Sequence, residues 1–407
     1  MNSRERVRAA LNHQVTDRVP VDFGGSRVTG IGALAYKNLL NHLGMHEEVR
    51  IYDCKQQLAE PSLDMMNRLG SDVVQLHRLA PGTGLPFLRI DRWQPGLLTD
   101  GSPCLVPEGY ESKITKEGQF QILHNGVICA TRVPGSLYFD ICHSPLEKAS
   151  TFADIDAYQF PDPWSAREEA YLKERIQTLY HGTDKALFAG LPLMNCSFFE
   201  MSLILFGYTN FMGLLLEDPD IIAYWLDKKL AHDCEIMEKY LAIAGPYIEA
   251  IQMNDDYGAQ SALQISPNIY RTLFKPRQKK WIDFVKARTK AKVFIHCDGA
   301  IEEIIPDFIE VGIDILNPLQ TSAKGMEPQK IKAKFGNNLA FWGGGVETQS
   351  TLPFGTVDEI RKEVRERLDM LKTNGGFVFG TIHNIQPDIS PEKIMAIFDT
   401  VREYGKF

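Results

Sequence analysis

Short apolar runs alternate with longer amphipathic runs along most of the chain. A brief run such as 292–295 is typical of a strand buried on both faces, whereas apolar residues spaced three and four apart predict helices. Residues 356–371 show the helical pattern well. Thr356 and Glu359 have the spacing of a capping box, and Gly375 and its neighbour Gly376 follow the last apolar position.

Eight strands are predicted in this way, and six or more of them precede a helix. They lie at 19–23, 71–77, 185–190, 248–253, 292–296, 314–317, 339–342 and 377–382. Strict strand–helix alternation implies a parallel sheet, and eight such units can close on themselves. The predicted fold class is therefore α/β, a (β/α)8 TIM barrel. A doubly wound open sheet is the alternative, but Gly24-Gly25-Ser26 is too short for the phosphate-binding loop of that fold.

The alternation of short apolar and longer amphipathic runs stops between residues 80 and 144. Glycine and proline become frequent, 120–124 alternates between apolar and polar residues, and Asn125-Gly126 is typical of a hairpin turn. We expect a β-rich insertion that covers one mouth of the barrel. The whole chain, 1–407, is then a single domain.

Composition excludes several classes of protein. The chain has 407 residues, of which 44% are apolar, and this composition is typical of globular proteins. Its net charge of −8 argues against a general nucleic-acid surface. No apolar run approaches the length of a membrane span, and the charged start 1–6 lacks a signal sequence, so we expect a cytoplasmic protein. The seven cysteines are scattered without a Cys-x-x-Cys pair, which predicts free thiols.

Polar residues of ligand and acid–base types gather at the predicted strand ends. In a barrel these ends converge on one cavity, where chemistry collects. The residues expected to contact a substrate there are Asp22, His77, Asn254, Asn317, Gln320, Trp342 and Glu347.

His296 and Asp298 stand two apart at the end of a strand, so their side chains point to the same side. This pair suits a metal, or a base with an orienting carboxylate; a core histidine beside a turn aspartate is the structural alternative. With His383 after the last strand, they form a two-histidine, one-carboxylate set for zinc or another divalent ion.

Six motifs together resemble a known family. They are Asp17-Arg-Val-Pro-Val21, Asn254-Asp-Asp-Tyr-Gly258, His296-Cys-Asp-Gly299, Asp314-Ile-Leu-Asn-Pro-Leu-Gln320, Phe341-Trp-Gly-Gly344 and Gly380-Thr-Ile-His-Asn384. The chain resembles the uroporphyrinogen decarboxylase superfamily, in particular its cobalamin-dependent methyltransferase-like branch. The resemblance implies a (β/α)8 barrel. It also implies, for members that transfer methyl groups, a zinc held by His-x-Cys after one strand and by a cysteine after the last.

This chain departs from that ligand pattern. His296 matches the first ligand, but Asp298 and His383 stand where the family has cysteines, and Cys297 occupies the intervening position. A site of oxygen and nitrogen ligands is harder than a thiolate site and can take another divalent metal.

The resemblance implies a methyltransferase that moves a methyl group from a small methylated substrate, such as a methoxylated aromatic or a methylamine, to the corrinoid of a separate partner protein. The bound metal would act as a Lewis acid. Asp255 or Asp256 would donate a proton, with Tyr257 as a second candidate. Helix capping or a turn is the structural alternative for the two aspartates.

Two other functions stay open. One is a lyase that decarboxylates a small or tetrapyrrole acid without a cofactor, and the other is a binding protein without activity. The founding decarboxylases carry an arginine-rich loop after the first strand, whereas this loop contains only Arg27 and also holds Asp22. An acidic mouth would repel an octacarboxylate, so the tetrapyrrole activity is disfavoured.

Overall fold

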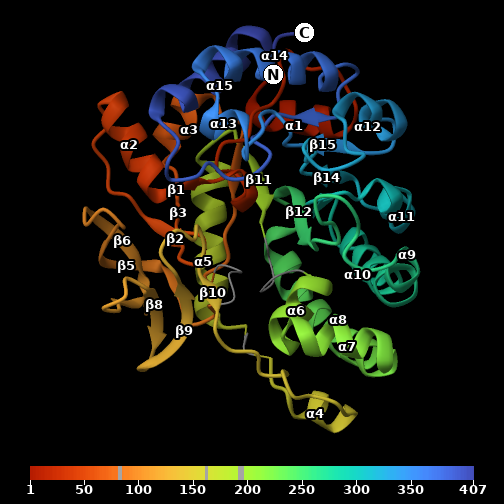
Figure 1. Ribbon diagram of the computed structural model, residues 1–407. Coiled ribbons are helices and arrows are strands. Elements are labelled where there is room, and N and C mark those ends of the chain that lie inside the picture. Colours follow the sequence, from red (N-terminus) through yellow and green to blue (C-terminus); the bar gives the residue numbers. More distant parts are fainter. Residues whose placement is uncertain (81–84, 161–163, 191–196) are drawn as a thin grey trace.

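The computed structural model describes residues 1–80, 85–160, 164–190 and 197–407. Within these ranges a curled parallel sheet of seven strands forms the centre of the protein, with helices along its outer side (Figure 1). Its order is β16-β15-β14-β13-β12-β11-β4. The strands are β4 (Val73–Gln75), β11 (Ala186–Ala189), β12 (Ile248–Asn254), β13 (Lys292–His296), β14 (Ile315–Asn317), β15 (Ala340–Trp342) and β16 (Phe377–Val378).

The segment 19–23, predicted as the first strand, is not a strand, so the sheet has seven strands where eight were predicted. It makes one parallel bridge, between Val21 and Phe379 of the segment that follows β16. The backbone N–H of Asp72 also donates to the carbonyl oxygen of Val21 (2.7 Å). A regular ladder fails here because Pro20 has no N–H and the N–H of Val21 donates to the Asp72 carboxylate (2.9 Å).

Apolar side chains fill the inside of the curled sheet. The cluster contains Phe188, Phe294 and Trp342 from three of the strands, and Val7 and Leu11 of helix α1 (Ser3–Leu11) close one end of it. The rings of Phe188 and Phe294 meet edge to face, with centroids 5.0 Å apart. Because apolar side chains fill the interior of the sheet, polar chemistry is left to the carboxyl ends of the strands.

Helices cover the outside of the sheet, and their starts follow the predicted signals. Thr356 and Glu359 form the capping box of α14, and Pro391 begins α15. The helices after α1 are α2 (Ala33–Leu43), α3 (Leu63–Leu69), α4 (Phe152–Ala157), α5 (Ala166–Ile176), α6 (Phe199–Phe206), α7 (Tyr208–Glu217), α8 (Pro219–Ala244), α9 (Pro267–Ile269), α10 (Lys275–Lys286), α11 (Ile305–Val311), α12 (Pro328–Phe335), α13 (Thr351–Phe354), α14 (Val357–Leu371) and α15 (Pro391–Tyr404). Short helical turns η1–η4 cover Arg27–Thr29, Gln177–His181, Tyr270–Phe274 and Glu302–Ile304.

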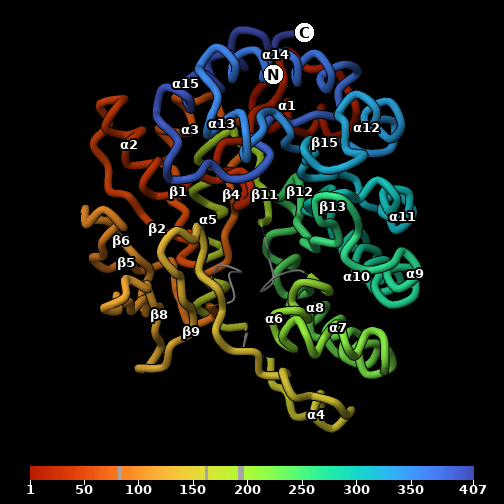
Figure 2. The backbone as a smooth tube through the Cα atoms, viewed as in Figure 1, coloured from red at the N-terminus to blue at the C-terminus, as the bar shows by residue number. Residues whose placement is uncertain are grey.

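The insertion between residues 80 and 144 is β-rich, as predicted, in its described part from residue 85. Its strands gather on one side of the molecule, away from the C-terminal helices (Figure 2). They form a pair, β5 (Arg89–Leu97) and β6 (Pro103–Glu108), and a four-stranded sheet of β7 (Glu111–Ile114), β8 (Phe120–His124), β9 (Val127–Arg132) and β10 (Asp140–Ile141). A small sheet of β1 (Ile31–Gly32), β2 (Ile51–Asp53) and β3 (Leu58–Ala59), which the sequence pattern did not predict, precedes it.

The six cysteines in the described ranges are free, and Cys196 lies outside them. No single helix of the described chain is long and apolar enough to cross a membrane. Helices α6 and α7 meet that standard only as a pair, by length and composition alone, and they are bent by 114° relative to each other.

Candidate functional site

His296, the last residue of β13, is held in one orientation by the neighbouring strand. Asn317 at the end of β14 donates from Nδ2 to the carbonyl oxygen of Trp342 (2.7 Å), so its Oδ1 faces Nδ1 of His296 at 2.6 Å. The amide oxygen can only accept, which places the proton on Nδ1 and leaves a lone pair on Nε2. Nε2 lies 3.6 Å from Asp298 Oδ2.

Three predicted ligand side chains come together here. The ligand atoms of His296, Asp298 and His383 all lie within 4.8 Å of one another. Asp298 is positioned by a close crossing of two loops, because a Cβ on Gly299 would lie 2.4 Å from the backbone of Gly258. Only glycine fits such an approach, and Gly299 also has a positive φ of 94°.

His383 is held by residues of its own loop and of the insertion. Its Nδ1 lies 3.1 Å from Asn384 Oδ1 and 3.4 Å from the hydroxyl of Tyr138, which donates to the same amide oxygen at 2.8 Å. Gln386 Nε2 donates in turn to the Tyr138 hydroxyl (2.8 Å). As for His296, the Nδ1 side of the ring is occupied and Nε2 is left for a ligand.

This donor set fits a divalent metal ion. Burial lowers the pKa of His383, which favours the neutral imidazole that binds metals. Each imidazole also has a second hydrogen-bond partner at Nδ1, as metal-binding histidines usually do. Cys297 is not part of the group; its buried sulfur accepts from the backbone N–H of Tyr257 (3.4 Å).

Carboxylic acids lie beside the three ligands. Asp256 accepts from the backbone N–H of Asp298 (2.8 Å), and Asn254 donates to Glu200 of α6. Burial, followed by the negative charge of Asp256, raises the pKa of Glu200 to about 8. Burial and the charge of Asp298 raise the pKa of Asp256 well above its ordinary value. Glu200 can therefore hold a proton at neutral pH.

Asp255 and Tyr257, predicted as proton donors, are both hydrogen-bonded within the interior. Asp255 is fully buried and accepts from Ser197 Oγ (2.8 Å) and from the backbone N–H of Phe199 (2.7 Å) at the start of α6. The Tyr257 hydroxyl donates to the same carboxylate (2.9 Å). Burial raises the pKa of Asp255, yet these donors occupy its oxygens. The geometry favours Asp256 and Glu200 over Asp255 and Tyr257 as proton donors to a substrate.

Asp22 and Trp342, predicted to bind substrate, contact each other. Trp342 donates from Nε1 to Asp22 Oδ2 (2.7 Å), and Thr29 and the backbone N–H of Gly25 donate to the same carboxylate. Burial raises the pKa of Asp22 to about 6. The pair ties the segment before η1 to the packed interior of the sheet and leaves little of either side chain for a ligand.

The remaining strand-end residues divide between this site and another cavity. Gln320 lines a cleft of about 460 Å³ with Asp298, His383, Tyr138 and the exposed Phe354. The side-chain oxygen of Gln320 accepts from the backbone N–H of Gly299 (2.6 Å). The cleft has both the ligand group and apolar walls, as small-molecule sites usually do.

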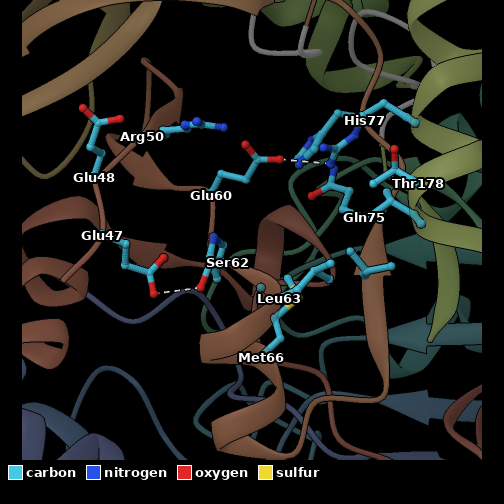
Figure 3. Close-up of a pocket in the computed structure, with 15 residues that line it drawn as sticks. Glu47, Glu48, Arg50, Glu60, Ser62, Leu63, Met66, Gln75, His77 and Thr178 are labelled. Carbon is cyan, nitrogen blue, oxygen red and sulfur yellow. Dashed lines mark hydrogen bonds and ion pairs between the residues drawn. The ribbon is translucent and has the colours of Figure 1, made fainter. Parts of the chain in front are cut away.

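Glu347 and His77 do not join the ligand group. Glu347 accepts from Thr321 Oγ1 and from the backbone N–H of Gln349, both at 3.1 Å, and so connects the loop after β15 to the loop after β14. His77 packs against Tyr52, with ring centroids 4.4 Å apart and ring planes tilted by 51°, and lines a different cavity, drawn in Figure 3. Burial lowers its pKa to about 4.

Sequence reasoning missed Glu200 and Tyr138. Both come from segments without a chemical motif: Glu200 lies in the first turn of α6, and Tyr138 lies in the insertion. The start of α6 is anchored on Asp255, which brings Glu200 to the strand ends. That long-range hydrogen bond has no signal in the local sequence.

A parallel sheet with a His-Asp-His group where its strands end defines an α/β enzyme with its site at the carboxyl ends of the strands. The family is shown by sequence: the model described as "Uroporphyrinogen decarboxylase (URO-D)" matches residues 144–404. The chain belongs to this family, as the six motifs predicted.

Known relatives are distant. The uroporphyrinogen decarboxylase of Pseudomonas fluorescens (strain Pf0-1) is 25% identical over 341 residues, 79% of this chain and 90% of that protein. The one of Pseudomonas syringae pv. tomato is 24% identical over 279 residues, 66% of this chain and 73% of that protein. Among solved structures, a methyltransferase from Methanosarcina mazei aligns with a TM-score of 0.55 and 18% identity, covering 99% of each chain. That likeness shows a shared fold.

Proposed function

We propose that this protein is a methyltransferase that takes a methyl group from a small methylated substrate and passes it to a corrinoid on a separate partner protein. The observation that carries the proposal is the convergence of His296, Asp298 and His383 beside Glu200 and Asp256. The fold shared with the Methanosarcina mazei methyltransferase supports it. We also infer that 19–23 acts as the eighth element that closes the barrel.

The chain's own residues have separate tasks in this proposal. His296, Asp298 and His383 would hold a divalent ion, which when bound supplies Lewis-acid polarisation of the substrate heteroatom. Asn317 and Asn384 hold the two imidazoles in place. When the carbon–heteroatom bond breaks, its electron pair stays on the heteroatom, which then needs a proton. Glu200 holds one at neutral pH and can deliver it from its carboxyl group.

The ligand set favours removal of a methyl group from an oxygen or nitrogen over its delivery to a thiol. Thiolate ligands donate strongly to a metal, whereas a carboxylate and two imidazoles leave it more electrophilic. An electrophilic centre suits an ether or amine leaving group. The apolar cleft wall at Phe354 and Leu137 suits both a small organic substrate and the docking of the partner.

The names of the relatives favour a second function, decarboxylation. The residues at the site favour it less. The single arginine of the loop, Arg27, forms an ion pair with the buried Asp53 and so offers little positive charge to a substrate. A substrate with many carboxylates needs several cationic partners, which this loop does not provide.

Corrinoid spectroscopy tests the proposal. The purified protein, loaded with Zn²⁺ or Co²⁺, is mixed with cob(I)alamin and, in turn, methanol, a methoxybenzoate and methylamines. We expect the cob(I)alamin spectrum to convert with at least one donor, and His383→Ala to abolish the conversion. His42→Ala is the matched control, since His42 lies on the surface of α2. Release of carbon dioxide from uroporphyrinogen, or methylation of a thiol from methylcobalamin with no activity on any donor, would contradict the assignment.

A further inference from the structure

A second cavity lies between β4, the segment 47–62 that precedes α3, and the end of α5. Its volume is about 310 Å³, at the small end of the range for small-molecule sites. It has no lining residue in common with the cleft at His383. Figure 3 shows Glu60 and Gln75 extending toward each other across this space, with His77 above them. The proposed function uses none of these side chains.

Two buried polar atoms, in side chains that line this cavity, have no partner in the described part of the chain. Gln75 is only 4% exposed; its Nε2 donates to the carbonyl oxygen of Gly190 (3.4 Å), and its Oε1 accepts from no described group. Arg175 donates from Nη2 to Glu60 Oε1 (3.0 Å), while its buried Nε–H has no described acceptor. Buried polar groups are nearly always hydrogen-bonded, so a free acceptor and a free donor in one cavity indicate a missing ligand.

Charge restricts the kind of ligand. Burial alone would raise the pKa of Glu60, but charge interactions, of which that with Arg175 is the largest, outweigh it and keep the pKa below its ordinary value. The cavity wall has two guanidinium groups, of Arg50 and Arg175, and three carboxyl groups, of Glu47, Glu48 and Glu60. His77 adds no charge at neutral pH, because burial keeps its imidazole neutral. Groups of both signs suit a ligand that carries an acceptor and a donor, and a guanidinium binds a carboxylate well.

We propose that this cavity binds a small carboxylic acid that carries an amino or hydroxyl group on the neighbouring carbon. Its carboxylate would accept from Arg175 Nε and from Arg50, and its amino or hydroxyl group would donate to Gln75 Oε1. Both free atoms of the cavity then gain a partner. A simple carboxylic acid would satisfy only the arginine side, and an amino alcohol only the glutamine side.

Binding measurements on the whole protein test this proposal. The probes are alanine and lactate, with propanoate and 2-aminopropan-1-ol as the two partial ligands, studied by calorimetry and by the rise in melting temperature. We expect alanine or lactate to bind at least tenfold more tightly than both partial ligands. Gln75→Leu, which keeps the volume but removes the acceptor, should erase that preference. Gln94→Leu, on β5 outside the cavity, should keep it.

Arg175→Lys provides a second variant that keeps the positive charge but has no Nε–H. It should weaken alanine or lactate at least tenfold while the protein keeps its fold, shown by circular dichroism. The proposal is overturned if all four probes bind equally or none binds at up to 50 mM (roughly the weak limit of small-ligand recognition). It is also overturned if Gln75→Leu binds alanine and lactate as the unaltered protein does. Methyl transfer does not enter these assays, so their outcome is independent of the proposed function.

Discussion

Asn317 offers the sharpest test of the metal site, because it touches a ligand without being one. Its Oδ1 holds Nδ1 of His296 at 2.6 Å, and its Nδ2 donates to the carbonyl oxygen of Trp342 at 2.7 Å. In Asn317→Ala the imidazole loses the acceptor that fixes its tautomer and ring orientation. Loss of such a partner typically weakens metal binding about 10–100-fold, or about 1.4–2.7 kcal/mol.

The same variant should also lose stability. The carbonyl oxygen of Trp342 and the Nδ1–H of His296 both lose a buried partner, and an unpaired buried group costs about 1–3 kcal/mol. Equilibrium dialysis against Zn²⁺, with metal analysis of the protein, measures the affinity. Urea unfolding of the metal-free protein measures the stability. Asn317→Asp keeps an acceptor for His296 and should retain most of the affinity.

Asn254→Ala is the matched control, since Asn254 ends the adjacent strand but its side chain donates to Glu200 and not to an imidazole. It should bind Zn²⁺ as tightly as the unaltered protein. The reasoning is refuted if Asn317→Ala binds Zn²⁺ with unchanged affinity, or if both asparagine variants weaken binding equally. Either result would mean that Asn317 does not act through the imidazole.

Three further outcomes are expected. His296→Ala should abolish stoichiometric Zn²⁺ binding in dialysis while circular dichroism stays unchanged, because the apolar interior lies below it; retained binding would exclude this ligand. The Glu200 carboxyl has a pKa raised to about 8, so the stability that its proton contributes is complete below about pH 4.5 and is lost as the pH rises through 8. The melting temperature of the metal-free protein should therefore fall between pH 5 and 8 by more than that of Glu200→Gln, and parallel curves would contradict the raised pKa. Asp72→Ala removes the fully buried partner of Arg6 and Arg18 and should lower the free energy of unfolding in urea by about 3–5 kcal/mol; a loss under about 1 kcal/mol would show that the pair does not hold α1 to the sheet.

Local patterns in the sequence were enough to predict most elements and the family. The capping box at Thr356, the buried run before His296 and the hairpin turn at Asn125 depend only on near neighbours, and the structure has a helix, a strand and a β-hairpin at these places. Strand–helix alternation likewise gave the parallel sheet. The position of His296 and Asp298 at one strand end follows from the same local rule. Their closeness to His383 does not, because β14 and β15 stand between β13 and β16 and only the curl of the sheet brings the three ligands together.

Only the tertiary structure decided which strand-end residues face the site. A strand end fixes the edge of the sheet at which a side chain lies, but it does not fix the partner that the side chain finds there. Asp255 meets the start of α6, Trp342 meets Asp22, and His77 turns into a second cavity, because donors distant in sequence reach them. The same long-range packing brings Glu200 and Tyr138 to the ligand group. Hydrogen bonds between distant segments thus assigned the roles that spacing along the chain left open.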